Sequence, residues 1–145
     1  MTNFDYLKAE PRFDSFTQAA IAAEKIYSID MGACAVNCRR AMEFAVKFMY
    51  SVDADLEPPY QDNLQSLITN EDFREIVGAD LWQRIDFIRK TGNAANHESK
   101  KLSKERVALC VENLHYFLDF VAFCYTDKCT AGDYDKSLLE QAEAD

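Results

Sequence analysis

Apolar residues at helical spacing constrain this chain more than any other feature. Between residues 32 and 52 they recur every three or four positions and form one continuous stripe, made by Cys34, Cys38, Ala41, Met42, Ala45, Phe48 and Met49. This pattern predicts an amphipathic helix with one buried face. No stretch shows the sustained alternation of a strand, and 4 Gly and 3 Pro are too few for the turns of a sheet-rich fold. The sequence therefore predicts an all-α fold.

The same spacing predicts further helices, at about residues 13–27, 62–67, 70–77, 79–89 and 103–125. Gly78 separates two of these segments, and Ser103 offers an N-cap for the last. Asp14 or Ser15 offers an N-cap for the first, after an extended lead-in over residues 1–12. From the apolar stripes we expect a core that includes Met42, Phe48, Trp82, Ile85, Leu114 and Leu118.

The composition is that of one folded domain. The 145 residues suffice for a single core, and 48% apolar with 28% charged residues is typical of globular proteins. The opening MTNFDYLKAE shows no basic start followed by an apolar segment, and no apolar run approaches the length needed to cross a membrane. We therefore expect a soluble, cytoplasmic protein without a membrane partner.

The cysteines raise the question of a disulfide or metal site: Cys34, Cys38, Cys110, Cys124 and Cys129. Their number is odd and four of them lie in apolar helical patterns, which is typical of buried free thiols. Cys34 and Cys38 are one helical turn apart, but structural zinc needs two further ligands, and the paired spacing of zinc modules is missing. We predict free thiols and no metal site.

Charge is unevenly distributed along the chain. The net charge of −9 argues against a surface that binds nucleic acid all over. Residues 84–106, however, include seven basic and three acidic residues, so this segment carries a charge of +4 and the rest of the chain a charge of −13. Residues 127–145 carry six acids and two lysines. We predict a helical domain over residues 1–126 and an acidic segment over 127–145, which is either a linker towards another domain or a frayed end.

The segment from Arg89 to His97 holds the residues best suited to chemistry, in a chain that lacks the common phosphate-binding, zinc-protease and serine-nucleophile motifs. Arg89 can hold a phosphate through two parallel donors, Asn93 can position a hydroxyl, and His97 can move a proton near neutral pH. Such a set suits RNA cleavage. It also suits a structural role, with the arginine and asparagine capping helix ends around Gly92, and from spacing alone we favour that role.

Several motifs of this chain resemble those of a known family. The run IRKTGNAANH follows CRRAMEFAVKFMY and NLQSLI, while the chain opens on TNFDYL and its last long helix ends on DFVAFCY. In this order they resemble a domain of unknown function in the HEPN superfamily, found at the N-terminus of the R subunits of type I restriction enzymes. The resemblance covers about residues 1–126. It implies an HEPN-like bundle of four to five helices.

The resemblance also implies a parent protein and its partners. An R subunit is an ATP-dependent DNA translocase and a type I site-specific endonuclease that cuts unmodified foreign DNA. ATP and Mg²⁺ would act in its later domains, and this domain would hold no cofactor. Its partners would be the other subunits of the restriction-modification complex.

Two roles for Arg89 follow from the resemblance. In ribonuclease members of the superfamily an arginine and a histidine, separated by four to six positions, meet across a homodimer. Here seven residues separate Arg89 from His97, which argues against this activity. In the structural alternative Glu43, which resembles a glutamate on the family's second helix, would pair with Arg89. His115 is expected in the core rather than as a second base.

From these observations we expect an accessory interaction domain without a reaction of its own. Contact with DNA or RNA phosphates would use its basic residues Lys90, Lys100, Lys101, Lys104 and Arg106. One alternative is a metal-independent ribonuclease that acts as a dimer through Arg89, Asn93 and His97. Another is a module that senses nucleotides or nucleic acid without a reaction.

Overall fold

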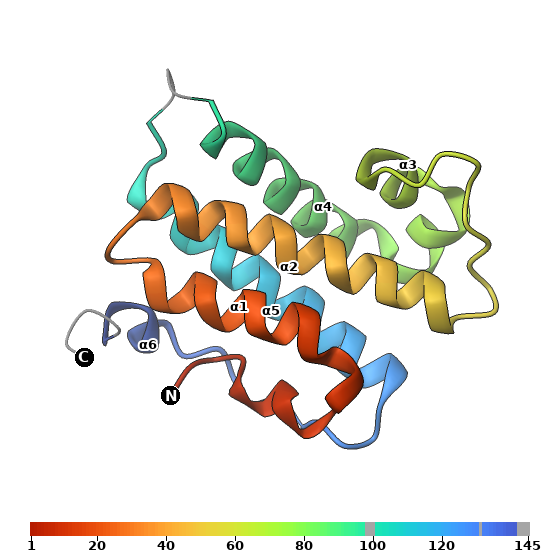
Figure 1. Ribbon diagram of the computed structural model, residues 1–145, viewed down its shortest axis with the longest axis horizontal. Coiled ribbons are helices and arrows are strands. Elements are labelled where there is room, and N and C mark those ends of the chain that lie inside the picture. The colour runs from red at the N-terminus through yellow and green to blue at the C-terminus, as the bar shows by residue number, and fades with distance from the viewer. Residues whose placement is uncertain (98–100, 131, 142–145) are drawn as a thin grey trace.

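The computed structural model describes residues 1–97, 101–130 and 132–141 (Figure 1). Two short 3-10 helices open the chain, η1 (Asp5–Ala9) and η2 (Pro11–Phe13). The α-helices that follow are α1 (Asp14–Ile26), α2 (Met31–Val52), α3 (Leu64–Thr69), α4 (Glu71–Ala95), α5 (Lys104–Tyr125) and α6 (Lys136–Gln141). The described residues include no strand, so the prediction of an all-α fold is confirmed.

Helix α2 is the centre of the bundle. It packs against α1, α4 and α5, and α4 also packs against α5. In Figure 1, α2 crosses the front of the molecule between α1 and α4, and α5 lies behind it. Tyr50 of α2 stacks on Phe73 near the start of α4, while Arg39 lies against Gly92 near the end of α4. The two helices are therefore antiparallel.

The buried side chains confirm most of the expected core. Four of the six expected residues are fully buried: Met42, Ile85, Leu114 and Leu118. Phe48 and Trp82 are only partly buried and pack against the same core. The indole N–H of Trp82 donates to the backbone oxygen of Ile68 at 2.6 Å, so this ring lies where α3 meets α4.

Helix α4 confirms one prediction and corrects another. The helix is interrupted at Gly78, as predicted, where φ is 82° and ψ is 164°, a conformation that favours glycine. The helix then continues to Ala95, past its predicted end near residue 89. Thr91, Gly92 and Ala94 are buried in this last part. Their packing against α2 and α5 offsets the low helix propensity of threonine and glycine.

The first residues are folded, not extended as predicted. Phe4 and Leu7 are fully buried around η1, so the segment is held by packing rather than by a periodic pattern. The predicted N-caps Asp14 and Ser15 are also wrong. Phe13 occupies the cap position of α1 without a side-chain hydrogen bond, because η2 runs directly into the helix.

Residues 127–130 and 132–140, which the sequence analysis assigned to an acidic linker or a frayed end, lie against the bundle. Leu138 and Leu139 of α6 are buried. The side-chain amide of Asn3 donates to the backbone oxygen of Asp135 at 3.0 Å, and the backbone N–H of Asp135 donates to Oδ1 of Asn3 at 2.7 Å. The described part of this segment thus packs against the bundle as far as α6, and residues 131 and 142–145 lie outside the described residues.

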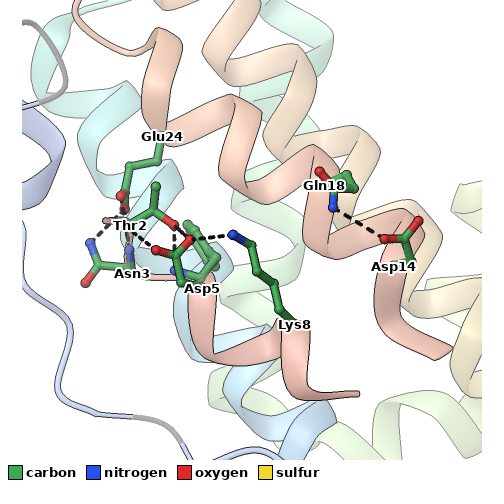
Figure 2. A network of polar contacts seen from close by, with 8 residues as sticks. Thr2, Asn3, Asp5, Lys8, Asp14, Gln18 and Glu24 are labelled. Atoms are coloured by element: carbon green, nitrogen blue, oxygen red, sulfur yellow. Dashed lines mark hydrogen bonds and ion pairs between the residues drawn. The ribbon is translucent and has the colours of Figure 1, made fainter. Parts of the chain in front are cut away.

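A buried carboxylate holds the N-terminal segment in place (Figure 2). Glu24 of α1 is 1% exposed and accepts hydrogen bonds from the backbone N–H of Asn3 at 3.0 Å and from its Nδ2 at 2.7 Å. Burial raises the pKa of Glu24 above its ordinary value, against the opposing effect of these hydrogen bonds. Thr2 donates its backbone N–H and its hydroxyl to the carboxylate of Asp5 at 2.9 and 2.8 Å, which closes the first turn.

All five cysteines are free thiols. Cys34, Cys38 and Cys110 are buried, and hydrogen bonding to the other two thiols together with burial raises the pKa of Cys38. No group of three His, Cys, Asp or Glu side chains within the described part of the chain is placed to hold a metal ion.

Helix α5 is more apolar than the sequence analysis recognised. By length and composition it could cross a membrane, a property hidden by Glu112 and Asp119, which interrupt its apolar run. More than half of that stretch is buried in the bundle, which is typical of the core helix of a folded domain.

His115 of α5 is buried beside the rings of Phe4 and Tyr134, and burial lowers its pKa. The expectation of a core histidine is confirmed.

Candidate functional site

The candidate residues Arg89, Asn93 and His97 lie at the C-terminal end of α4. Arg89 and Asn93 are one turn apart on the same side of the helix. At about 1.5 Å per residue, Arg89 and the last helical residue are about 9 Å apart along the axis. His97 lies beyond that end with an exposed side chain, and its backbone N–H donates to the oxygen of Ala94 at 3.0 Å. The histidine therefore does not share the turn that holds the arginine.

Asp86 is the carboxylate that engages Arg89. Its Oδ1 accepts a hydrogen bond from Nε of Arg89 at 3.0 Å and lies 2.8 Å from Nη2 of the same guanidinium. Its Oδ2 lies 3.1 Å from Nζ of Lys90. Burial acts to raise the pKa of Asp86, but the hydrogen bonds from Arg89 and Lys90 outweigh it and hold this pKa below its ordinary value. One carboxylate thus pairs with two of the predicted phosphate-contacting cations, and the three groups together keep one positive charge.

Glu43, the predicted partner of Arg89, forms its ion pairs within α2. Its carboxylate lies 3.0 Å from Nζ of Lys47 and 3.5 Å from Nη1 of Arg39, both one turn away. Cations at this spacing reach the glutamate without crossing to another helix. The prediction of a Glu43–Arg89 pair is wrong, because each helix supplies its own carboxylate.

Arg39 is a residue of this region that the sequence analysis missed. A Cβ atom at Gly92 would lie 2.4 Å from Cβ and 2.7 Å from Cδ of Arg39, so the glycine allows α2 and α4 to approach closely. The Nε of Arg39 is buried and has no hydrogen-bond partner among the described residues. The sequence feature that could have indicated this contact is Gly92 itself, because a glycine inside a helix often marks a close approach of another element.

Gly92→Ala is expected to lower the free energy of unfolding by about 1–3 kcal/mol, the usual effect of overpacking. The new methyl group would have to displace the stem of Arg39, whose first atoms are fixed to the α2 backbone. Thermal or chemical denaturation measures the change.

Gly32→Ala is the matched control, because the nearest atom to its Cβ lies at an ordinary 3.5 Å. Alanine favours the helix there, so we expect a gain of up to about 1 kcal/mol. Equal effects at the two glycines would contradict the close approach at Gly92.

The basic residues gather where α4 ends and α5 begins. Arg106 is partly buried, and its Nε donates to Oγ1 of Thr91 at 3.2 Å, which ties the first turns of α5 to α4. Lys101 and Lys104 are exposed and form no ion pair with another described residue. We call Lys101, Lys104 and Arg106 the basic rim. Lys100, which was predicted with them, lies outside the described residues.

A family model matches most of the chain. Residues 21–143, from the middle of α1 to beyond α6, match the family described as Domain of unknown function (DUF4145). The chain belongs to this family. No curated protein and no solved structure matches it. The family description names no activity, and the likeness to HEPN domains and to R subunits stays a prediction.

In this DUF4145 domain the candidate residues differ in how far their side chains are engaged by other groups. Asp86 engages Nε and Nη2 of Arg89, and the side chain of His97 forms no hydrogen bond with a described residue that would orient it. His115 lies among aromatic rings in the core. The exposed ammonium groups of the basic rim are therefore the groups best placed to attract an anion.

Proposed function

We propose that the chain is an accessory interaction domain without a reaction of its own, which contacts nucleic-acid phosphates weakly through the basic rim. The parent protein in this proposal is the R subunit of a type I restriction enzyme, which the sequence motifs resemble. The partners are then its sister subunits, and ATP-dependent translocation and DNA cleavage belong to other domains of that subunit.

The ion pair between Arg89 and Asp86 carries the proposal. A catalytic arginine must turn its donors towards the scissile phosphate, but here Nε and Nη2 both point at one carboxylate at 3.0 and 2.8 Å. Releasing the arginine would leave Asp86, which is buried, without its main partner, and such a separation is costly. This geometry supports a structural arginine and argues against the ribonuclease alternative.

The charges of the basic rim support the second half of the proposal. Lys101 and Lys104 are exposed and Arg106 is partly exposed, which suits diffuse attraction to phosphates rather than the reading of base edges. The rest of the surface carries a large negative charge, since the whole chain has a net charge of −9. Binding of this kind is weak, insensitive to sequence and sensitive to salt.

The purified domain is expected to leave single-stranded RNA intact in the absence of added metal, in an assay with an active ribonuclease as positive control. We expect His97→Ala to change the free energy of unfolding by less than about 0.5 kcal/mol, because the side chain is exposed. RNA cleavage that disappears in His97→Ala while the fold persists would overturn the proposal in favour of the ribonuclease.

A further inference from the structure

Exposed apolar side chains form a line along α5. Among the large apolar residues that the described chain exposes, three share this helix at intervals of seven: Leu109, Tyr116 and Phe123, at 42, 45 and 86%. Seven residues make close to two turns, so these side chains lie on one side of the helix. Single exposed apolar residues are ordinary, whereas a line of them on one face indicates a contact surface.

Three carboxylates accompany this line at the same spacing: Glu105, Glu112 and Asp119. None of them forms an ion pair with another residue that the structure describes. We call the three apolar and three acidic residues the α5 stripe. Its apolar and acidic groups alternate along nearly the full length of the helix.

A pocket of about 440 Å³ opens at the N-terminal end of the α5 stripe. Glu105, Leu109 and Glu112 line it from α5, and Tyr134 and Glu140 line it from the C-terminal segment. An apolar wall with carboxylates around it fits the aliphatic stem and the charged head of a lysine or arginine side chain. The nearby ring of Tyr134 adds a surface that attracts cations.

The cations near the stripe leave its carboxylates unsatisfied. The guanidinium of Arg84 lies 4.0 Å from the ring centroid of Tyr116 and donates to Oδ1 of Asn113 at 2.7 Å, so it is engaged between α4 and α5. Lys104 and Lys136 line the pocket, but neither forms an ion pair with a described residue. The carboxylates of the stripe are therefore available to the cations of a partner.

Charge also decides between occupants of this face. A second copy of the chain would bring its own acidic α5 stripe and a net charge of −9, and like charges placed face to face repel. The same carboxylates oppose an anionic lipid surface. A basic partner has neither penalty.

The geometry points to the α5 stripe as the docking face for a basic amphipathic helix of a partner protein. Its apolar side chains would cover Leu109, Tyr116 and Phe123, its basic side chains would meet the acids between them, and one lysine or arginine would enter the pocket. This inference rests on the proposed role as an interaction domain and names the surface that the role uses.

A synthetic helical peptide tests the inference directly. The probe is a fluorescein-labelled peptide of about 18 residues, or five turns, with leucine at every seventh position and lysines between. Fluorescence anisotropy should show saturable binding to the full chain at roughly physiological salt, and a peptide with glutamate in place of lysine should not bind. The absence of binding by the lysine peptide would overturn the inference.

Two double variants place the peptide on the stripe. Leu109→Ser with Phe123→Ser should weaken binding at least about tenfold, because both remove exposed contact area. The matched control is Ile29→Ser with Tyr60→Ser, two side chains that are 76 and 104% exposed elsewhere. Glu105→Lys with Glu112→Lys should weaken binding by a similar factor, whereas the same charge change at the exposed Glu57 and Glu75 should have much less effect. Equal losses in the stripe and control variants would mean that the peptide responds only to net charge, which rejects the docking face.

Sedimentation of the chain alone tests the second copy as occupant. We expect a monomer, and a dimer that Phe123→Ser dissociates would replace the partner helix with self-association.

Failure of the inference remains distinguishable from failure of the proposed function. RNA cleavage removes the proposed function whatever the peptide does, whereas an intact RNA substrate without peptide binding removes only the docking face.

Discussion

Leu114→Ala and Leu118→Ala are each expected to lower the free energy of unfolding by about 2–5 kcal/mol. Both side chains are fully buried on α5, which packs against α2 and α4. Truncation removes buried apolar surface and leaves a cavity that the neighbouring helices fill only in part. Denaturant unfolding followed by far-UV circular dichroism measures the loss.

Leu109→Ala provides the control on the same helix, since its side chain is 42% exposed. We expect a change within about 0.5 kcal/mol, the range of ordinary surface substitutions. Losses below about 0.5 kcal/mol at both Leu114 and Leu118 would mean that the buried face of α5 is misassigned.

Lys101→Glu combined with Lys104→Glu is expected to abolish measurable binding of single- or double-stranded DNA by the domain. The two lysines are the exposed ammonium groups of the basic rim, and their reversal turns local attraction into repulsion on an already acidic protein. Binding of the unmodified chain should be weak, independent of DNA sequence, and steeply reduced by salt. Fluorescence anisotropy with labelled oligonucleotides of different sequence at several salt concentrations measures these three properties.

The control carries the same charge change elsewhere. Lys25 and Lys128 are exposed on other parts of the chain, and their joint replacement by glutamate alters the net charge equally. We expect the control to weaken binding far less than the rim variant. Unchanged affinity in the rim variant would assign Lys101 and Lys104 to an ordinary solvated surface.

The sequence predicts the fold best where a helix buries one continuous stripe. The helices expected over residues 32–52 and 103–125 appear as α2 and α5 within one residue of those bounds, and Ser103 accepts the N-cap hydrogen bond from Arg106. Long stripes of large side chains record burial directly, so periodicity alone locates such helices.

Prediction fails where small residues or tertiary packing provide the order. The last turns of α4 bury Thr91, Gly92 and Ala94, which give almost no hydrophobic signal, while exposed Lys90 suggests a loop. The N-terminal segment is held by the burial of Phe4, which lies beside His115, and by the hydrogen bonds of Asn3 to Glu24, which are separated by 21 positions. Neither case follows from local spacing.

In the candidate site, too, local contacts could be predicted from the sequence and contacts between helices could not. Asp86 lies three residues before Arg89, a spacing at which side chains on a helix meet. Their ion pair could therefore have been predicted from the sequence if the segment had been recognised as helical. The contact between Arg39 and Gly92 could not be predicted from the sequence, because it depends on how α2 and α4 cross. The proposed role of Glu43 came from resemblance, and the ion pairs that form instead are local ones.

The hydrogen bonds between Asn3 and Asp135 have a kinetic consequence. These residues are 132 positions apart, so their contact closes almost the longest loop that the chain contains. Closing such a loop is entropically unfavourable until the helices between have assembled, which places the contact after the main barrier to folding. Interactions absent from the transition state slow unfolding without accelerating folding. We therefore expect the paired ends to lengthen the lifetime of the native bundle, while the rate at which it forms depends on the helices between them.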